Sequence, residues 1–395
     1  MHTKIKHIVE QSFDDLILWR EHLHANPELS FKEFNTANFV AKRLHEMGIS
    51  YTQGIAGTGI VALIKGKNSS KKCIALRADL DALPIQEEND IPSKSTVAGV
   101  MHACGHDVHT TCLLGAAKVL NSVKSEFEGT IKLIFQPGEE ILPGGASMMI
   151  SEGVLENPQV DEIYALHVLP SMEVGKVGFK EGKYMAACDE LYLTVIGKGG
   201  HAALPDQYNN PIMIIAELLP KLESYLNSIS LATSPYIFAF GDLQANGATN
   251  VIPEKALAKG TLRTMDEDWR EIVHVKLQAF VNDFLQSKNA TGELKILKGY
   301  PFLQNDTKRT ETAFKIAEAY LGKENVERMS IRMTAEDFSY YSQKIPACFF
   351  RLGVRNEDLG IVHSVHHPKF NIDNNALKVG VGTLSSIALK ALSTK

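Results

Sequence analysis

The chain has 395 residues, 44% of them hydrophobic, and a formal net charge of −5 with acidic and basic residues interspersed. This length exceeds what one compact core usually holds, so two domains are expected. No long basic run is present, which argues against binding to nucleic acid or to an anionic membrane. We find no apolar signal-peptide core and expect no membrane-spanning stretch, which favours a cytoplasmic protein.

The first half of the chain alternates between the apolar spacings of helices and strands. Helical spacing in residues 5–17 and 113–120 predicts two helices, the second with Asp107 as a possible N-cap. Short apolar runs predict strands at 60–64, 73–76, 131–135 and 163–166. This alternation predicts an α/β domain with a mixed, largely parallel sheet.

After Gly182 the pattern changes. We expect strand 191–196, helix 211–226, strands 236–243 and 256–263, helix 266–285 and strand 294–297. That β-α-β-β-α-β order is ferredoxin-like. Helix 310–321, strand 347–351 and helix 375–391 then resume the α/β pattern. The sequence therefore predicts a discontinuous domain of residues 1–184 and 300–395, with an inserted domain of residues 185–299.

Candidate metal donors are concentrated in residues 101–109, which read Met-His-Ala-Cys-Gly-His-Asp-Val-His. Cys104 and His106 can share a metal centre if Gly105 allows a tight turn between them. His102 and His109 are better suited to supporting roles, in which they hydrogen-bond a ligand and set its orientation. The five cysteines are odd in number and widely spread, which argues against a disulfide framework.

Further polar side chains follow predicted strands. Asp79, Glu139, Glu140 and His167 each come after such a strand. Sites in open α/β sheets form at the carboxyl ends of strands, so these residues are expected to converge. The adjacent carboxylates can divide the work, one binding metal while the other takes a proton from water and returns it to a leaving amine.

Two other classes of protein fit parts of this pattern. A cysteine amidase would use Cys104 as nucleophile, with His106 or His102 as base and Asp107 to orient it. That mechanism leaves the acidic pair and His167 without a role. A metal-stabilised binding protein without activity is a further alternative, but it would be expected to lack the base Glu139, which is present.

Seven motifs together resemble a known family. They are HANPELS (24–30), LRADLDALP (76–84), MHACGHD (101–107), QPGEE (136–140), GKGGH (197–201), TNVIP (249–253) and EDF (336–338). With these motifs in this order, the chain resembles the amidohydrolase branch of the aminoacylase and carboxypeptidase-G metallopeptidases. Hippurate hydrolases, plant auxin-conjugate hydrolases and N-acetyl-diaminopimelate deacetylases belong to that branch.

The resemblance implies a role for each residue that matches a motif. It implies a centre of two divalent metals with the ligands Cys104, His106, Glu140, His167 and His366. Glu139 matches the catalytic base and acid, and Asp79 matches an aspartate that orients a metal-binding histidine. His363 and His367 compete with His366 as the C-terminal ligand, and the family's spacing to Pro368 favours His366.

The inserted domain contributes three further matches. His201 is similar to a histidine that reaches an active site, often that of a partner subunit, and stabilises the oxyanion. Asn250 and Arg263 are similar to residues that contact substrate. Arg263 could hold a free carboxylate or be a solvated strand-end arginine, and Asn250 could equally be a turn residue. A homodimer formed through this domain is expected.

The resemblance implies metal-dependent hydrolysis of the amide bond of N-acyl amino acids, which releases a carboxylic acid and an amino acid. The alternative substrates are short peptides, cleaved by a dipeptidase or carboxypeptidase activity. Manganese or zinc are the first candidates for the metal, and cobalt or nickel also suit these ligands.

Overall fold

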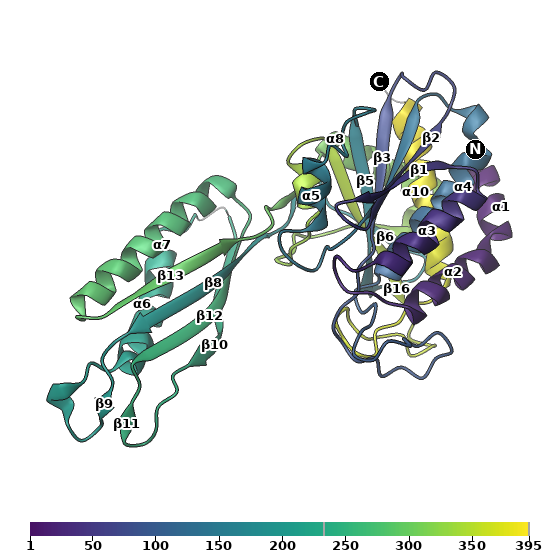
Figure 1. The fold of residues 1–395 in the computed structure, drawn as a ribbon. Helices are drawn as coiled ribbons and strands as arrows, with labels where there is room; N and C mark the ends of the chain where they lie inside the picture. Colours follow the sequence, from purple (N-terminus) through teal and green to yellow (C-terminus); the bar gives the residue numbers. More distant parts are fainter. Residues whose placement is uncertain (232–233, 394–395) are drawn as a thin grey trace. The chain divides into compact units, whose positions relative to one another are not determined.

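The computed structural model describes residues 1–231 and 234–393 and contains two compact units (Figure 1). The first unit comprises Met1–Tyr184, Gln304–Ile331 and Asp337–Lys395, and the second comprises Met185–Leu303 and Arg332–Glu336. The second unit therefore extends beyond residue 299, the predicted end of the inserted domain, and includes a second segment, Arg332–Glu336. That segment is attached by the Ala186 N–H, which lies 3.1 Å from the carbonyl oxygens of Arg332 and Thr334.

The first unit is built on a mixed sheet of eight strands in the order β1-β2-β4-β3-β5-β16-β6-β15. The pairs β4–β3, β3–β5, β5–β16 and β6–β15 are parallel, whereas β1–β2, β2–β4 and β6–β16 are antiparallel. Every residue of β3 and β4 is buried, as expected for strands covered on both faces. The bounds are β1 (Ser50–Ile55), β2 (Gly59–Lys65), β3 (Cys73–Asp79), β4 (Thr130–Gln136), β5 (Glu162–Glu173), β6 (Val177–Phe179), β15 (Val326–Arg328) and β16 (Ala347–Arg355).

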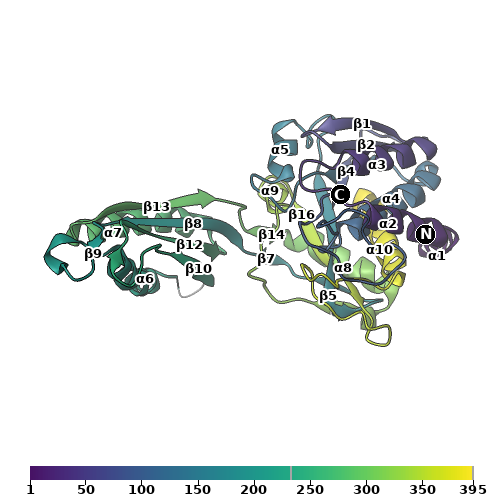
Figure 2. The same cartoon turned by 60° about the horizontal axis from the view of Figure 1, so that its bottom comes forward.

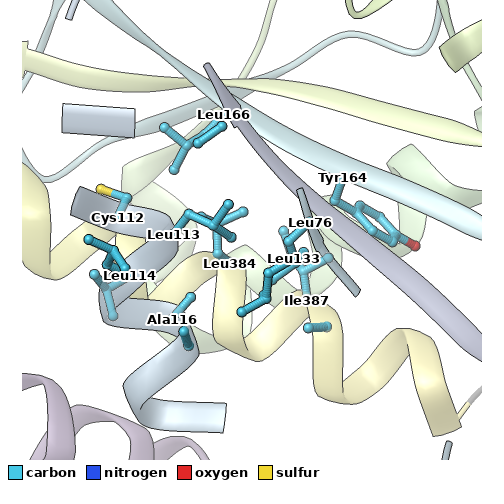
Figure 3. Close-up of a cluster of buried hydrophobic side chains, with 14 of the residues drawn as sticks. Leu76, Cys112, Leu113, Leu114, Ala116, Leu133, Tyr164, Leu166, Leu384 and Ile387 are labelled. Carbon is cyan, nitrogen blue, oxygen red and sulfur yellow. The ribbon is translucent and has the colours of Figure 1, made fainter. Parts of the chain in front are cut away.

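Helices pack against this sheet and enclose its core. Leu113 on α4 and Leu384 and Ile387 on α10 meet Leu133 and Tyr164 of the sheet in one buried cluster (Figure 3). The helices of this unit are α1 (His2–Gln11), α2 (Phe13–Ala25), α3 (Phe34–Glu46), α4 (His106–Ser122), α5 (Gly145–Ser151), α8 (Thr307–Leu321), α9 (Ser339–Ser342) and α10 (Asn375–Ser393).

Helix α10 corrects one expectation from the sequence. We expected no stretch long and apolar enough to cross a membrane, yet the 19 residues of α10 meet that test by length and composition. Its most apolar window is 72% buried inside the unit. A helix that is apolar on all sides is typical of the centre of a large core as well as of a membrane.

The start of α4 also differs from the prediction. Its N-cap is Gly105, with a left-handed φ of 82°, and not Asp107. Asp107 lies inside the first turn, where its Oδ2 accepts a hydrogen bond from Arg20 Nε at 2.9 Å. The helix begins earlier because glycine readily adopts the left-handed conformation that the turn after Cys104 requires.

The second unit has the ferredoxin-like order that the sequence predicted. Its four strands pair in the order β10-β12-β8-β13, all antiparallel, and α6 and α7 cover one face (Figure 2). Burial alternates along β8, as expected for a sheet with one covered face. The bounds are β8 (Ala187–Ile196), α6 (Pro211–Ser228), β10 (Tyr236–Gln244), β12 (Lys255–Thr264), α7 (Glu267–Ser287) and β13 (Thr291–Lys298), with the short pair β9 (Gly200–His201) and β11 (Val251–Ile252); β7 (Gly182–Met185) and β14 (Leu303–Asn305) span the unit boundaries.

Candidate metal centre

The predicted site residues of the first unit gather near the carboxyl ends of neighbouring inner strands of its sheet. Asp79 is the last residue of β3, and Glu139 and Glu140 lie in the loop that follows β4. His167 was expected after a strand but lies inside β5, opposite Arg351 of β16. The strand continues past it because the parallel pairing with β16 extends in register to Leu169.

The turn at Gly105 brings Cys104 and His106 together. A side chain at Gly105 would place its Cβ 2.6 Å from Val168 Cγ2, so the turn packs directly against β5. Cys104 Sγ then lies 3.5 Å from His167 Nε2. The ligand atoms of Cys104, His106 and His167 all lie within 4.8 Å of one another, and all three residues are buried.

A second group of donors shares Cys104 with the first. Ligand atoms of Cys104, Glu140 and His366 also lie within 4.8 Å of one another, and His366 Nε2 is 3.4 Å from Glu140 Oε1. Among the residues that the structure describes, neither His363 nor His367 joins such a group. Their rings stack on each other instead, with centroids 4.3 Å apart.

Two buried atoms of this cluster have no hydrogen-bond partner in the described part of the chain. They are His106 Nε2 and Glu140 Oε1, which lie 3.9 Å apart. Buried polar atoms are almost always paired, because leaving one unpaired costs free energy. Imidazole nitrogen, thiolate and carboxylate are the donors that zinc and related divalent cations take. The residues therefore fit metal ions at this position.

The aspartate beside His106 is Asp81 rather than Asp79. His106 Nδ1 lies 3.1 Å from Asp81 Oδ1 but 3.8 Å from Asp79 Oδ1. Asp79 instead lies 2.6 Å from Nδ1 of His109, whose Nε2 accepts a hydrogen bond from the Val168 N–H at 2.9 Å. Asp81 is the second aspartate of the LRADLDALP motif, and no role was predicted for it from the sequence.

Both aspartates are held in the ionised form. Burial raises the pKa of Asp81, but His106, the Ser30 hydroxyl and the Glu140 N–H bind its carboxylate and lower the pKa below its usual value. Burial also raises the pKa of Asp79, yet its interactions with His106, His109 and Arg77 bring it well below the usual value. An ionised Asp81 favours a proton on Nδ1 of His106. The lone pair of Nε2 is then free to coordinate a cation.

Glu139 lies next to the two donor groups, and a contact with Asp337 helps to fix its position. It is 7% exposed, and its Oε1 accepts a hydrogen bond from the Asp337 N–H at 3.4 Å. Asp337 is itself fixed by Arg77 Nη2 at 2.7 Å and by Gln136 Nε2 at 2.8 Å. No role for Asp337 or Arg77 could be predicted from the sequence, although Asp337 belongs to the EDF motif, because their contacts join segments far apart in the chain.

The remaining predicted residues belong to the second unit, which brings only two of them together. His201 pairs with Val251 in the β9–β11 ribbon, and the Ala202 N–H donates to the carbonyl oxygen of Asn250 at 3.0 Å. Both His201 and Asn250 are exposed. Arg263 is half-buried on β12 opposite Cys188, the second residue of β8, whereas His201 follows the far end of that strand. Arg263 is therefore at the other end of the sheet.

Comparison with known proteins places the chain in one family. The model of peptidase family M20/M25/M40 matches residues 75–390. Thermostable carboxypeptidase 2 of Saccharolobus solfataricus is 36% identical over 98% of both chains, and N-acetylcysteine deacetylase of Bacillus subtilis is 36% identical over 96% of this chain and 97% of its own. The crystal structure of YxeP from Bacillus subtilis, described as a dinuclear metal binding peptidase, covers 98% of this chain and 99% of its own at 33% identity with a TM-score of 0.84. The chain belongs to peptidase family M20/M25/M40.

Proposed function

We propose that this hydrolase cleaves the amide bond of N-acyl amino acids and releases a carboxylic acid and an amino acid. The observation that carries the proposal is the pair of donor groups that share Cys104, beside the carboxylate of Glu139. In these groups His106 Nε2 and Glu140 Oε1 have no hydrogen-bond partner among the described residues. The relationship to N-acetylcysteine deacetylase supports an N-acyl amino acid as substrate.

Two divalent cations would be held by Cys104, His106 and His167 on one side and by Cys104, Glu140 and His366 on the other. When bound, such cations lower the pKa of a coordinated water and polarise the substrate carbonyl. Glu139 takes the proton of the attacking water and delivers it to the leaving nitrogen. Manganese and zinc are our first candidates, with cobalt and nickel as alternatives, because this mixed donor set suits all four.

The second unit is proposed to complete the site and to form a homodimer. His201 would stabilise the oxyanion, while Asn250 and Arg263 would contact substrate. Strand β10 lies at an edge of its sheet and exposes Ile237 and Leu243, which supports an interface at this unit. A cytoplasmic site of action is also proposed, since all five cysteines are free, as suits a reducing compartment.

Two alternatives differ in how well the observations support them. Cleavage of short peptides is supported by the relationship to thermostable carboxypeptidase 2. A mechanism with Cys104 as nucleophile is disfavoured, because burial and the charge of Glu140 raise the pKa of its thiol. Reactive cysteines need the opposite shift, toward the thiolate.

The test is amide hydrolysis by metal-stripped protein after separate reconstitution with zinc, manganese, cobalt and nickel. The substrates are N-acetyl, N-benzoyl and indole-acetyl amino acids together with dipeptides. Glu139→Gln is the control, because it removes the base but none of the five proposed ligands. Turnover that metal restores to the native protein alone supports the proposal. Activity that survives metal removal contradicts it, and activity on dipeptides alone favours the peptidase alternative.

A further inference from the structure

The proposed ligand His366 is held by its loop and not by a helix or strand. It lies between β16 and α10, and its side chain is 52% exposed. Its backbone is left-handed, with a φ of 64°, and its N–H donates to the carbonyl oxygen of Ala103 at 2.8 Å. A conformation of this kind persists only where surrounding contacts enforce it. The position of the imidazole therefore depends on what anchors the loop.

One buried side chain joins this loop to the helix that carries another proposed ligand. Arg20 of α2 is 3% exposed, and its Nη2 donates to Asn371 Oδ1 at 3.1 Å. Its Nε donates to Asp107 Oδ2 at 2.9 Å, and Asp107 directly follows His106. A single guanidinium thus spans the segments that carry His366 and His106.

The Asp107 end of this connection is rigid. His24 Nδ1 lies 2.8 Å from Asp107 Oδ2, and its Nε2 lies 3.1 Å from Glu87 Oε1. Buried ion pairs with additional hydrogen bonds are geometrically specific. At the other end, Arg20 Nη2 lies 3.1 Å from Asn371 Oδ1 and 3.2 Å from His24 Nδ1, so the bond to Asn371 is the one that ties Arg20 to the loop.

We propose that Arg20 and Asn371 are positioning residues that keep His366 within reach of the cation shared with Cys104 and Glu140. This inference rests on the proposed two-metal function. The donor group of Cys104, His106 and His167 is buried and lies on or next to regular elements, and none of its three side chains comes from the loop. Loss of the Asn371 bond should therefore weaken one metal site and spare the other.

The experiment is a calorimetric titration of the metal-free full chain with Mn²⁺, and separately with Zn²⁺. Native protein should bind two ions in two steps. Asn371→Ala should weaken the second step by roughly tenfold to 100-fold, as is typical for residues that support metal ligands, and leave the first unchanged. Asn371→Asp keeps an acceptor for Arg20 and should restore native affinity.

Asn121→Ala is the matched control. It removes a side-chain-to-backbone bond of 2.8 Å to Met47, near the opposite end of α4 from His106. The inference is overturned if Asn371→Ala binds both ions like the native protein, if it weakens both steps equally, or if Asn121→Ala has the same effect. Native protein that binds fewer than two ions would overturn the proposed two-metal function itself, and the inference with it. Thermal unfolding of each metal-free variant shows whether its fold is retained.

Discussion

The carboxylate of Glu33 accepts a hydrogen bond from the backbone N–H of Gly138 at 2.8 Å, directly before Glu139 and Glu140. Glu33 is fully buried and also accepts from the Phe31 N–H at 2.8 Å and from Thr58 Oγ1 at 2.6 Å. The ring of Phe31 covers Gly138 so closely that a Cβ there would lie 2.4 Å from it. The turn around Glu33 therefore fixes the loop that carries the proposed base.

We predict that Glu33→Ala lowers both stability and turnover. It leaves the donors on Gly138, Thr58 and the partly buried Phe31 unpaired, and an unpaired buried donor costs about 1–3 kcal/mol. The free energy of unfolding, measured in urea, should fall by at least about 3 kcal/mol. The fold-decrease in kcat should be larger than the fold-change in KM. Glu28→Ala is the control: Glu28 binds Asn35 and Thr36 at the start of α3 and should change stability but not kcat. Equal kcat in both variants would contradict a role for Glu33 in placing the loop.

Gly105→Ala should destabilise the first unit for two separable reasons. A left-handed φ of 82° costs a non-glycine residue about 1–2 kcal/mol, and the new Cβ would lie 2.6 Å from Val168 Cγ2. Val168→Ala removes the second cost but not the first. Urea unfolding of the two single variants and the double variant measures the coupling between them. If the losses in the free energy of unfolding are strictly additive, the contact with Val168 is not a reason why this position requires glycine.

Stability of the second unit should fall in acid through Asp189. Burial raises the pKa of this carboxyl, but hydrogen bonds from His274 and Arg270 and their charges lower it below its usual value. The folded pKa lies below the unfolded one, about 3.9, so the stabilisation is complete above that pH. It is lost as the pH falls from there through the folded pKa.

Asp189→Asn tests this dependence. The variant should be less stable at pH 7 by about 1.5–3 kcal/mol, because Arg270 loses a charged hydrogen-bond partner but keeps its ion pair with Glu267. The two stability curves should converge in acid, where native Asp189 is also neutral. The chain has two tryptophans, so Trp19→Phe leaves Trp269 as a fluorescent reporter of the second unit. Curves that stay parallel down to pH 3 would show that Asp189 does not titrate as proposed.

The sequence predicted the elements well where apolar periodicity is strong. The β-α-β-β-α-β order of the second unit is an example. Each of its elements turns one apolar face toward a small core, so its apolar residues recur with the period of a helix or a strand. Contacts between distant polar side chains were harder to predict. Arg77 and Asp337 are 260 positions apart, and no local pattern encodes their bond. His366 could be preferred over its neighbours only through a resemblance, because the loop conformation that directs each histidine depends on tertiary contacts.

The two aspartates of the LRADLDALP motif, Asp79 and Asp81, should have different functions. Asp81 binds Nδ1 of His106 and the N–H of Glu140, so it supports two proposed ligands at once. Asp81→Asn should therefore weaken metal binding by roughly tenfold to 100-fold. Asp79 contacts His109 and Arg77 instead.

Asp79→Asn should chiefly reduce stability, because the buried Arg77 loses the charge of one of its carboxylate partners. Metal titration and urea unfolding of both variants measure the two effects side by side. Because the neutral amide keeps the size of each side chain, a difference between the variants reflects charge and hydrogen bonding rather than lost volume. A larger loss of metal affinity in Asp79→Asn than in Asp81→Asn would return the orienting role to Asp79, and the 3.1 Å contact between His106 and Asp81 would then be incidental to metal binding.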